Sequence, residues 1–162
     1  MKKRRILVIG LIMLCCLCFT LLQTGKTFAQ TAHATHVASG HSYDGQWPDV
    51  AGCWGYSAYT IAATDATMDG HPTRIYLWYS PACGTNWSDY QILDGYSGAP
   101  ISTQVCKASG QDGPYLCKSS STLALSRIWS PMVYAPHDPA IGWGVYHGLN
   151  GFTWSFNTGW IY

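Results

Sequence analysis

Aspartate and histidine are the residue types in this chain that could carry acid–base chemistry. All eight acidic residues are Asp, and Glu is absent. A glycosidase would need two carboxylates, for which Asp65, Asp69, Asp94 and Asp138 are available. Asp69, Asp94 and Asp112 each precede Gly, a pairing typical of turns. We therefore interpret these carboxylates as turn residues and predict no catalytic residue.

Histidines could assist such chemistry. His137 adjoins Asp138, but neighbouring residues in a strand or loop rarely face each other, so an acid–base role would need partners from elsewhere. A polar stretch near the N-terminus holds three more: His33, His36 and His41. Short His-rich tracts can bind metal, but we favour a solvated tail. We found no G-x-S-x-G, H-E-x-x-H, P-loop or dinucleotide pattern. We predict neither a metal nor a cofactor.

Aromatic residues crowd the C-terminal part of the chain. Because aromatic faces stack on sugar rings, four side chains are candidates for ligand stacking: Trp143, Tyr146, Trp154 and Trp160. The alternative is that these aromatics fill the core of a small domain, as most aromatics do. A surface map of the Trp and Tyr residues distinguishes the two.

Four cations and a small-residue motif mark the first residues as an export signal. Lys2–Arg5 precede an apolar run from Ile6 to Phe19, and Thr27-Phe28-Ala29 has small residues at both ends. We predict a signal peptide over residues 1–29, a flexible polar leader over 30–51, and one β-rich domain over 52–162. The rival interpretation is a permanent membrane anchor.

Removal of residues 1–29 would change the charge and the cysteine count. Four of nine cations and all eight Asp residues remain, so the net charge becomes −4 with His neutral. Four scattered cations do not form the basic face that nucleic acid or anionic lipid requires. We predict a secreted protein that binds no nucleic acid and, after cleavage, no membrane.

Four cysteines follow the predicted signal: Cys53, Cys83, Cys106 and Cys117. An even number in an exported chain indicates disulfides, and four cysteines allow three connectivities. We expect Cys53–Cys83 and Cys106–Cys117, since the second pair flanks the turn-rich residues 110–114. A zinc site would need closer ligand spacing.

Alternating apolar and polar residues, broken by Gly and Pro, predict an all-β fold, a small antiparallel sandwich or barrel. The clearest hairpin joins residues 74–79 to 87–93 through a loop at 80–86. Further strands are predicted at 56–67, 101–107, 115–119, 132–134, 141–147 and 151–156, with a final edge strand at 159–162. Residues 119–128 are either a loop or a short helix.

A strand running into Tyr-Ser-Pro-x-Cys-Gly, followed closely by Trp, resembles the DUF2690 family of uncharacterised, YjfA-like secreted bacterial proteins. The matching residues are Tyr79, Ser80, Pro81, Cys83, Gly84 and Trp87, and the match covers about residues 52–93. The resemblance implies export, a Cys53–Cys83 bridge and a β-rich domain, but no activity. Two places where the family usually has Arg hold Trp78 and Asp89.

These observations favour a non-catalytic binding or surface-associated module whose ligand is a polysaccharide or another cell-envelope polymer. Two alternatives stay open. One is a secreted hydrolase that uses Asp and His. The other is a structural or inhibitory partner protein, which the sequence does not separate from a binding module.

Overall fold

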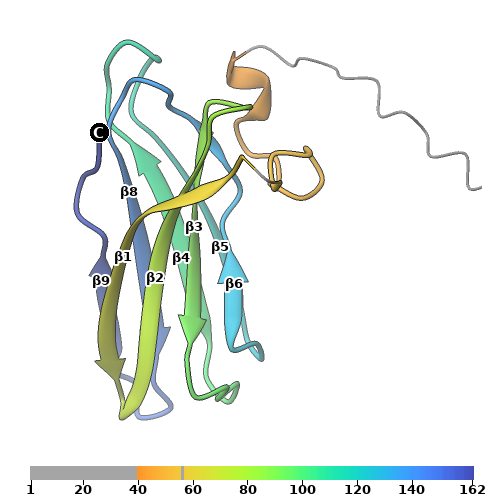
Figure 1. Cartoon of the computed structure of the whole chain (residues 1–162). Helices are drawn as coiled ribbons and strands as arrows, with labels where there is room; N and C mark the ends of the chain where they lie inside the picture. The colour runs from red at the N-terminus through yellow and green to blue at the C-terminus, as the bar shows by residue number, and fades with distance from the viewer. Residues whose placement is uncertain (1–39, 56) are drawn as a thin grey trace, which may run out of the picture. The chain divides into compact units, whose positions relative to one another are not determined.

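Nine β-strands form two antiparallel sheets in the computed structural model, which describes residues 40–55 and 57–162 (Figure 1). Sheet 1 lies nearer the viewer and has the order β1 (Tyr59–Met68), β2 (His71–Ser80), β3 (Thr85–Ile92), β6 (Arg127–Trp129), with β7 (Val133–Tyr134) also paired to β3. Sheet 2 has the order β5 (Leu116–Thr122), β4 (Ile101–Lys107), β8 (Ala140–His147), β9 (Thr153–Asn157). The predicted all-β fold is confirmed, and of the two expected architectures, sandwich or barrel, the two sheets form a sandwich.

The core lies between the two sheets. Ile75 and Leu77 of β2 are fully buried, as are Ile101 and Val105 of β4. Each such side chain contributes roughly 1.5–3 kcal/mol when it leaves water. Tyr90 of β3 is buried beside them, and this burial raises the pKa of its hydroxyl to about 12.

Polar and glycine residues bring the sheets close together at their centre. The Ser88 hydroxyl of β3 lies 2.7 Å from the Thr103 hydroxyl of β4. Gly144 of β8 faces the same layer, where a Cβ would lie 2.9 Å from the Phe156 ring and 3.1 Å from the Tyr90 ring. A larger residue at position 144 would therefore push the sheets apart.

Most predicted strands are present with shifted ends. The central hairpin is tighter than expected, because β2 and β3 extend until only residues 81–84 form the turn. Residues 119–128 continue β5 to Thr122, form a short loop at 123–126 and then begin β6, so the loop alternative holds for the middle of this stretch and no helix occurs there. The expected final strand at 159–162 is only a single bridge between Ile161 and Ala140.

Residues 40–55 pack against sheet 1. A 3-10 helix, Gly40–Tyr43, opens this segment, and Tyr43 joins a buried cluster with Cys53, Trp87 and Met132. Main-chain hydrogen bonds join Gly45 to Met132 and Met132 to Gln46. The packed structure thus starts before position 52, where we expected the domain to begin. The predicted signal peptide, His33 and His36 lie outside the described residues.

Both expected disulfides are present. Cys53 joins Cys83, with Cα atoms 5.9 Å apart, and so fixes the end of the 40–55 segment to the β2–β3 turn. Cys106 joins Cys117, its register partner across β4 and β5. Among the described residues, none of the helices has the length and apolar character needed to cross a membrane.

Candidate functional site

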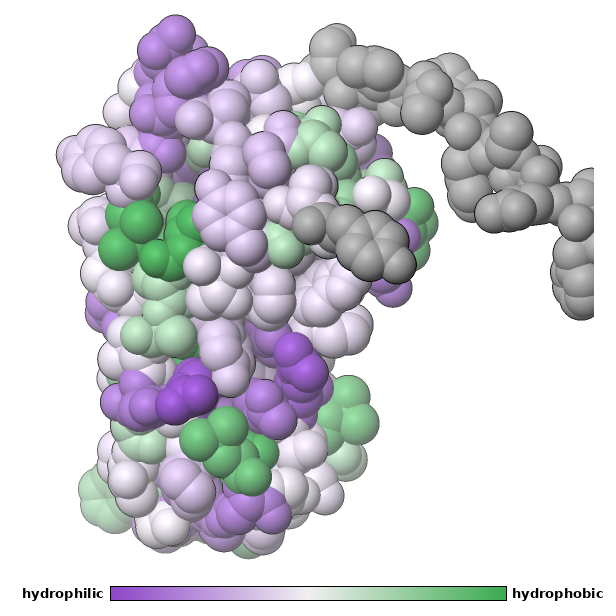
Figure 2. Space-filling view, viewed as in Figure 1, coloured by the Kyte–Doolittle hydropathy of each residue, from purple (hydrophilic) through white to green (hydrophobic). Residues whose placement is uncertain are grey.

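The outer face of sheet 1 carries aromatic and charged side chains. Antiparallel partners share a face, and successive residues alternate between faces. Since Ile75 and Leu77 face the core, Tyr76 faces outward with its partner Asp89, and Trp78 faces outward with its partner Trp87. Figure 2 shows this face: pale side chains of intermediate hydropathy cover most of it, and a band of strongly hydrophilic ones crosses its lower half.

Four tryptophans form a cluster on this face, which we call the tryptophan cluster: Trp54, Trp78, Trp87 and Trp129. The Trp54 ring centroid lies 5.1 Å from those of Trp78 and Trp129 and 5.6 Å from that of Trp87. Trp78 and Trp87 are parallel, with centroids 6.1 Å apart. Such contacts between aromatic rings add to the stabilisation from burial. The cluster therefore holds the 40–55 segment, β2, β3 and β6 together.

An ion pair lies beside the tryptophan cluster. Asp89 is fully buried, and Arg127 donates to its carboxylate from Nε at 2.9 Å and from Nη2 at 2.6 Å. These hydrogen bonds raise the pKa of Arg127 above its usual value. The guanidinium carbon also lies 5.5 Å from the centroid of the Trp129 ring. Arg127 is thereby held in one orientation, while 41% of its side chain stays exposed.

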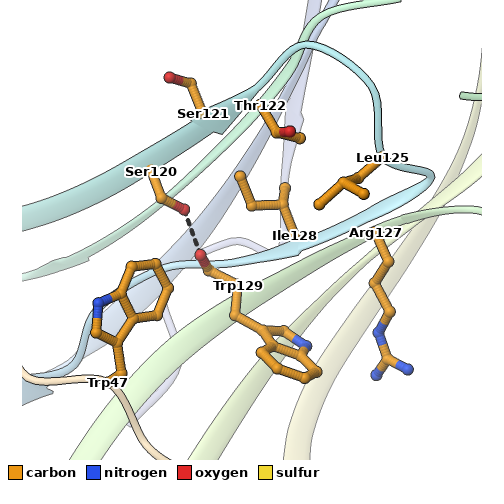
Figure 3. A pocket seen from close by; sticks show the side chains of 8 residues that line it. All are labelled: Trp47, Ser120, Ser121, Thr122, Leu125, Arg127, Ile128 and Trp129. Carbon is orange, nitrogen blue, oxygen red and sulfur yellow. Dashed lines mark hydrogen bonds between the residues drawn. The ribbon is translucent and has the colours of Figure 1, made fainter. Parts of the chain in front are cut away.

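A groove of about 560 Å³ opens next to this ion pair, at the edge where β5 meets β6 (Figure 3). Its walls combine aromatic, aliphatic, hydroxyl and guanidinium groups: Trp47, Ser120, Ser121, Thr122, Leu125, Arg127, Ile128 and Trp129. Trp47, in the 40–55 segment, is 40% exposed. The Ser120 hydroxyl donates to the Trp129 carbonyl, which fixes β5 against β6. We call this the Trp47–Trp129 groove.

The four aromatic residues proposed from the C-terminal sequence do not share one face. Tyr146 is 1% exposed, and Trp154, its register partner, packs against the same core cluster. Trp143 pairs with Gln104, which alternates with the core-facing Thr103 and Val105, so Trp143 lies on the opposite face of sheet 2. Trp160, 45% exposed, lies after β9. A single flat row of these rings is therefore not formed.

Each candidate acid has its own contacts or its own turn. Asp65 accepts hydrogen bonds from Arg74, which lower the pKa of Asp65. Asp94 accepts one from the His71 ring at 2.7 Å, which lowers the pKa of Asp94. Asp69 forms the β1–β2 turn with φ 51°. The turn interpretation of Asp69 agrees with this geometry.

Asp112 and Asp138 clamp two loops together. The Asp138 carboxylate accepts from the main-chain N–H groups of Gln111 and Asp112. The Asp112 carboxylate accepts from the main-chain N–H groups of His137 and Asp138 and from His137 Nδ1 at 3.0 Å. Burial acts to raise the pKa of Asp112, but the hydrogen bonds from His137 and Asp138 outweigh it and lower this pKa.

His137 thus contacts Asp112 and not the adjacent Asp138. His41 likewise contacts Asp44 at 2.9 Å, and His147 contacts the Thr153 hydroxyl at 3.2 Å. No sequence signal indicated the His137–Asp112 pair, because the two residues belong to different loops. Within the described residues, no group of three or more His, Cys, Asp or Glu side chains is arranged to hold a metal ion.

The residues that matched the family pattern build the β2–β3 turn. The main-chain N–H groups of Cys83 and Gly84 both donate to the Ser80 carbonyl. Gly84 has φ 64°, and a Cβ there would lie 3.0 Å from the Tyr134 ring. Trp87 is fully buried in the tryptophan cluster. These residues determine local structure and the position of the Cys53–Cys83 bridge.

Part of the tryptophan cluster could have been found from the sequence. Alternation places Trp78 on the outward face, and a tight hairpin would have placed Trp87 beside it. Trp47, Trp54 and Trp129 carried no such signal, because each reaches the face from a segment distant in sequence.

The two sheets, the short turns and the two bridges define a small disulfide-bonded β-sandwich with an aromatic groove at one edge. Residues 41–140 match the model of a family described as "Protein of unknown function (DUF2690)", and the chain belongs to this family. Neither the curated proteins nor the solved structures gave a match to this chain.

Proposed function

We propose that this protein is an exported, non-catalytic binding module whose Trp47–Trp129 groove binds a glycan of the cell envelope. The observation that carries the proposal is the composition of the groove, where indole rings, hydroxyl groups and a fixed guanidinium line one open cavity. Indole faces stack on the C–H faces of sugar rings, while hydroxyl and guanidinium groups bond to sugar hydroxyls.

The electrostatics favour a neutral segment of glycan. The positive charge of Arg127 is compensated by Asp89, so the pair offers oriented donors without net charge. Export is supported by the N-terminal sequence and by the two disulfides, which persist in oxidising compartments.

The test is retention of the purified protein on insoluble peptidoglycan and on cellulose and chitin, together with tryptophan fluorescence during titration with soluble fragments of these polymers. We expect retention on at least one matrix. Trp47→Ala should lower the affinity about tenfold or more, because a stacked ring contributes strongly to such sites. Trp47 is partly exposed, so its removal should leave the fold intact.

Trp160→Ala is the matched control, since Trp160 has a similar exposed fraction, 45% against 40%, and does not line the groove. If Trp160→Ala abolishes retention and Trp47→Ala does not, the binding surface is the C-terminal region and not the groove. If no matrix retains the protein and no fragment changes its fluorescence, the proposal is wrong.

A secreted hydrolase is the second candidate, favoured by the contact between His137 and Asp112. It requires that Asp112 act on a substrate, although its two oxygens already accept three hydrogen bonds from the 137–138 loop. Release of soluble fragments from the same matrices, lost in Asp112→Asn, would support this candidate over simple binding.

A further inference from the structure

A second, smaller cavity of about 230 Å³ lies at the end of the sandwich that holds the β2–β3 turn and residues 161–162. Its walls come from the start of β1, the end of β2, the start of β3, the loop before β8 and the last two residues. They include three tyrosines, two isoleucines and three polar side chains: Tyr59, Tyr79, Tyr162, Ile61, Ile161, Asn86, His137 and Asp138. None of these residues lines the Trp47–Trp129 groove.

We propose that this cavity binds a quaternary ammonium group such as that of choline, with Tyr59 and Tyr79 as the walls of an aromatic cage and the almost fully exposed Tyr162 at its rim. Tyr59 and Tyr79 are register partners across β1 and β2. Their ring centroids lie 5.9 Å apart and their planes meet at 82°, so the rings form two adjoining walls at nearly a right angle. Several aromatic walls around one cation are how proteins recognise quaternary ammonium ligands.

The charges around the cavity also select a cation. Asp138 lines it, is 8% exposed, and has its carboxylate held by two main-chain N–H groups. Asp112 lies behind His137 in the same clamp. Lys107 is buried and donates to the Asp112 carbonyl. The two carboxylates of Asp112 and Asp138 outnumber the one ammonium group of Lys107, so the net charge of these three side chains is negative. Neither Lys nor Arg is among the residues that line the cavity.

The size and remaining walls fit the same ligand. The cavity is smaller than the roughly 300–1,000 Å³ of pockets for drug-sized molecules, so it suits a small head group. Ile61 and Ile161 offer apolar surface to methyl groups. Quaternary nitrogen needs no hydrogen-bond acceptor, and an aromatic and aliphatic wall is sufficient for its methyl groups.

The deciding experiment compares choline with 3,3-dimethylbutan-1-ol, its uncharged isostere, in calorimetric titrations of the whole folded protein. We expect choline to bind and the isostere to bind at least about tenfold more weakly, because only the cation gains from the tyrosine faces. Tyr59→Leu and Tyr162→Leu should each weaken choline binding several-fold. Tyr115→Leu is the matched control, since Tyr115 is 58% exposed against 52% for Tyr59 and lies outside the cavity.

Phosphocholine and phosphatidylcholine vesicles form two further arms and distinguish a phosphoester or lipid head group from the free ion. In each arm, the cage is supported if Tyr59→Leu reduces binding and Tyr115→Leu does not. Thermal unfolding of each variant confirms that it is folded. The proposal is overturned if the isostere binds as tightly as choline, if all three Tyr variants behave alike, or if no choline compound binds. The cavity and the groove share no residue, so this result is independent of glycan binding.

Discussion

At the scale of single residues, the surroundings of each carboxylate decide what it can do. Asp112 and Asp138 together accept five hydrogen bonds, four of them from main-chain N–H groups of two loops. A buried N–H group that loses its acceptor costs roughly 1–3 kcal/mol. The main role of these two carboxylates is therefore to hold the two loops together.

Asp112→Ala should lower the free energy of unfolding by about 2–4 kcal/mol, because two main-chain N–H groups and the His137 ring lose their acceptor together. Urea denaturation followed by tryptophan fluorescence measures this change. Asp49→Ala is the control: Asp49 is exposed, and its replacement should change the stability by less than about 0.5 kcal/mol. Equal effects of the two variants would contradict a structural clamp.

The two Arg–Asp pairs of sheet 1 should differ in their contribution. Arg127→Ala leaves the fully buried Asp89 without a partner and should destabilise the fold by about 2–3 kcal/mol, less than for a fully enclosed pair because Arg127 is partly exposed. Arg74→Ala removes a bond to the exposed Asp65 and should change stability very little. Denaturation midpoints of the two variants test this order, and a larger loss for Arg74→Ala would contradict it.

At the scale of elements, the 40–55 segment completes the candidate site. It supplies Trp47 to the groove and Trp54 to the tryptophan cluster. Its end is fixed to the β2–β3 turn by Cys53–Cys83. Cys106–Cys117 instead reinforces β4 and β5, which are already paired along their length.

We therefore expect the two disulfides to have different effects on ligand binding. Cys53→Ser with Cys83→Ser should cost about 2–4 kcal/mol of stability and also weaken glycan retention, because Trp47 loses its fixed position. Cys106→Ser with Cys117→Ser is the matched control and should lower stability without the specific loss of retention. Retention assays at a temperature where both variants are folded make the comparison. Equal retention by both would show that the bridge at Cys53 does not position the groove.

At the scale of the whole molecule, Asp–His and Asp–Arg contacts link the loops and strands of both sheets. The pKa values of Asp65, Asp94 and Asp112 are all lowered in the folded state. A carboxylate with a lowered pKa stabilises the fold above its unfolded pKa, and this contribution is lost as pH falls through the folded pKa.

These three carboxylates should therefore cause no change in stability around neutral pH. Below about pH 4 they become protonated, and the stability should decrease. Thermal unfolding between pH 2 and pH 7, at values spaced by about one unit, measures the profile. Asp94→Asn should make the acid decline less steep, because the amide that replaces the carboxylate does not titrate, whereas Asp94 loses its charge-dependent bond to His71 in acid. An unchanged profile in this variant would show that Asp94 contributes nothing to it.

The sequence alone determined the class of fold, most strand positions, the cysteine pairs and the family, because alternation, turn residues and Cys spacing are local signals. The tertiary structure decided the sites. Trp47 and Trp129, and likewise Tyr59 and His137, are brought together by sheet pairing and loop packing over long sequence separations. Trp143 and Tyr146 are separated by strand alternation alone, since residues an odd number of positions apart on one strand face opposite sides of a sheet.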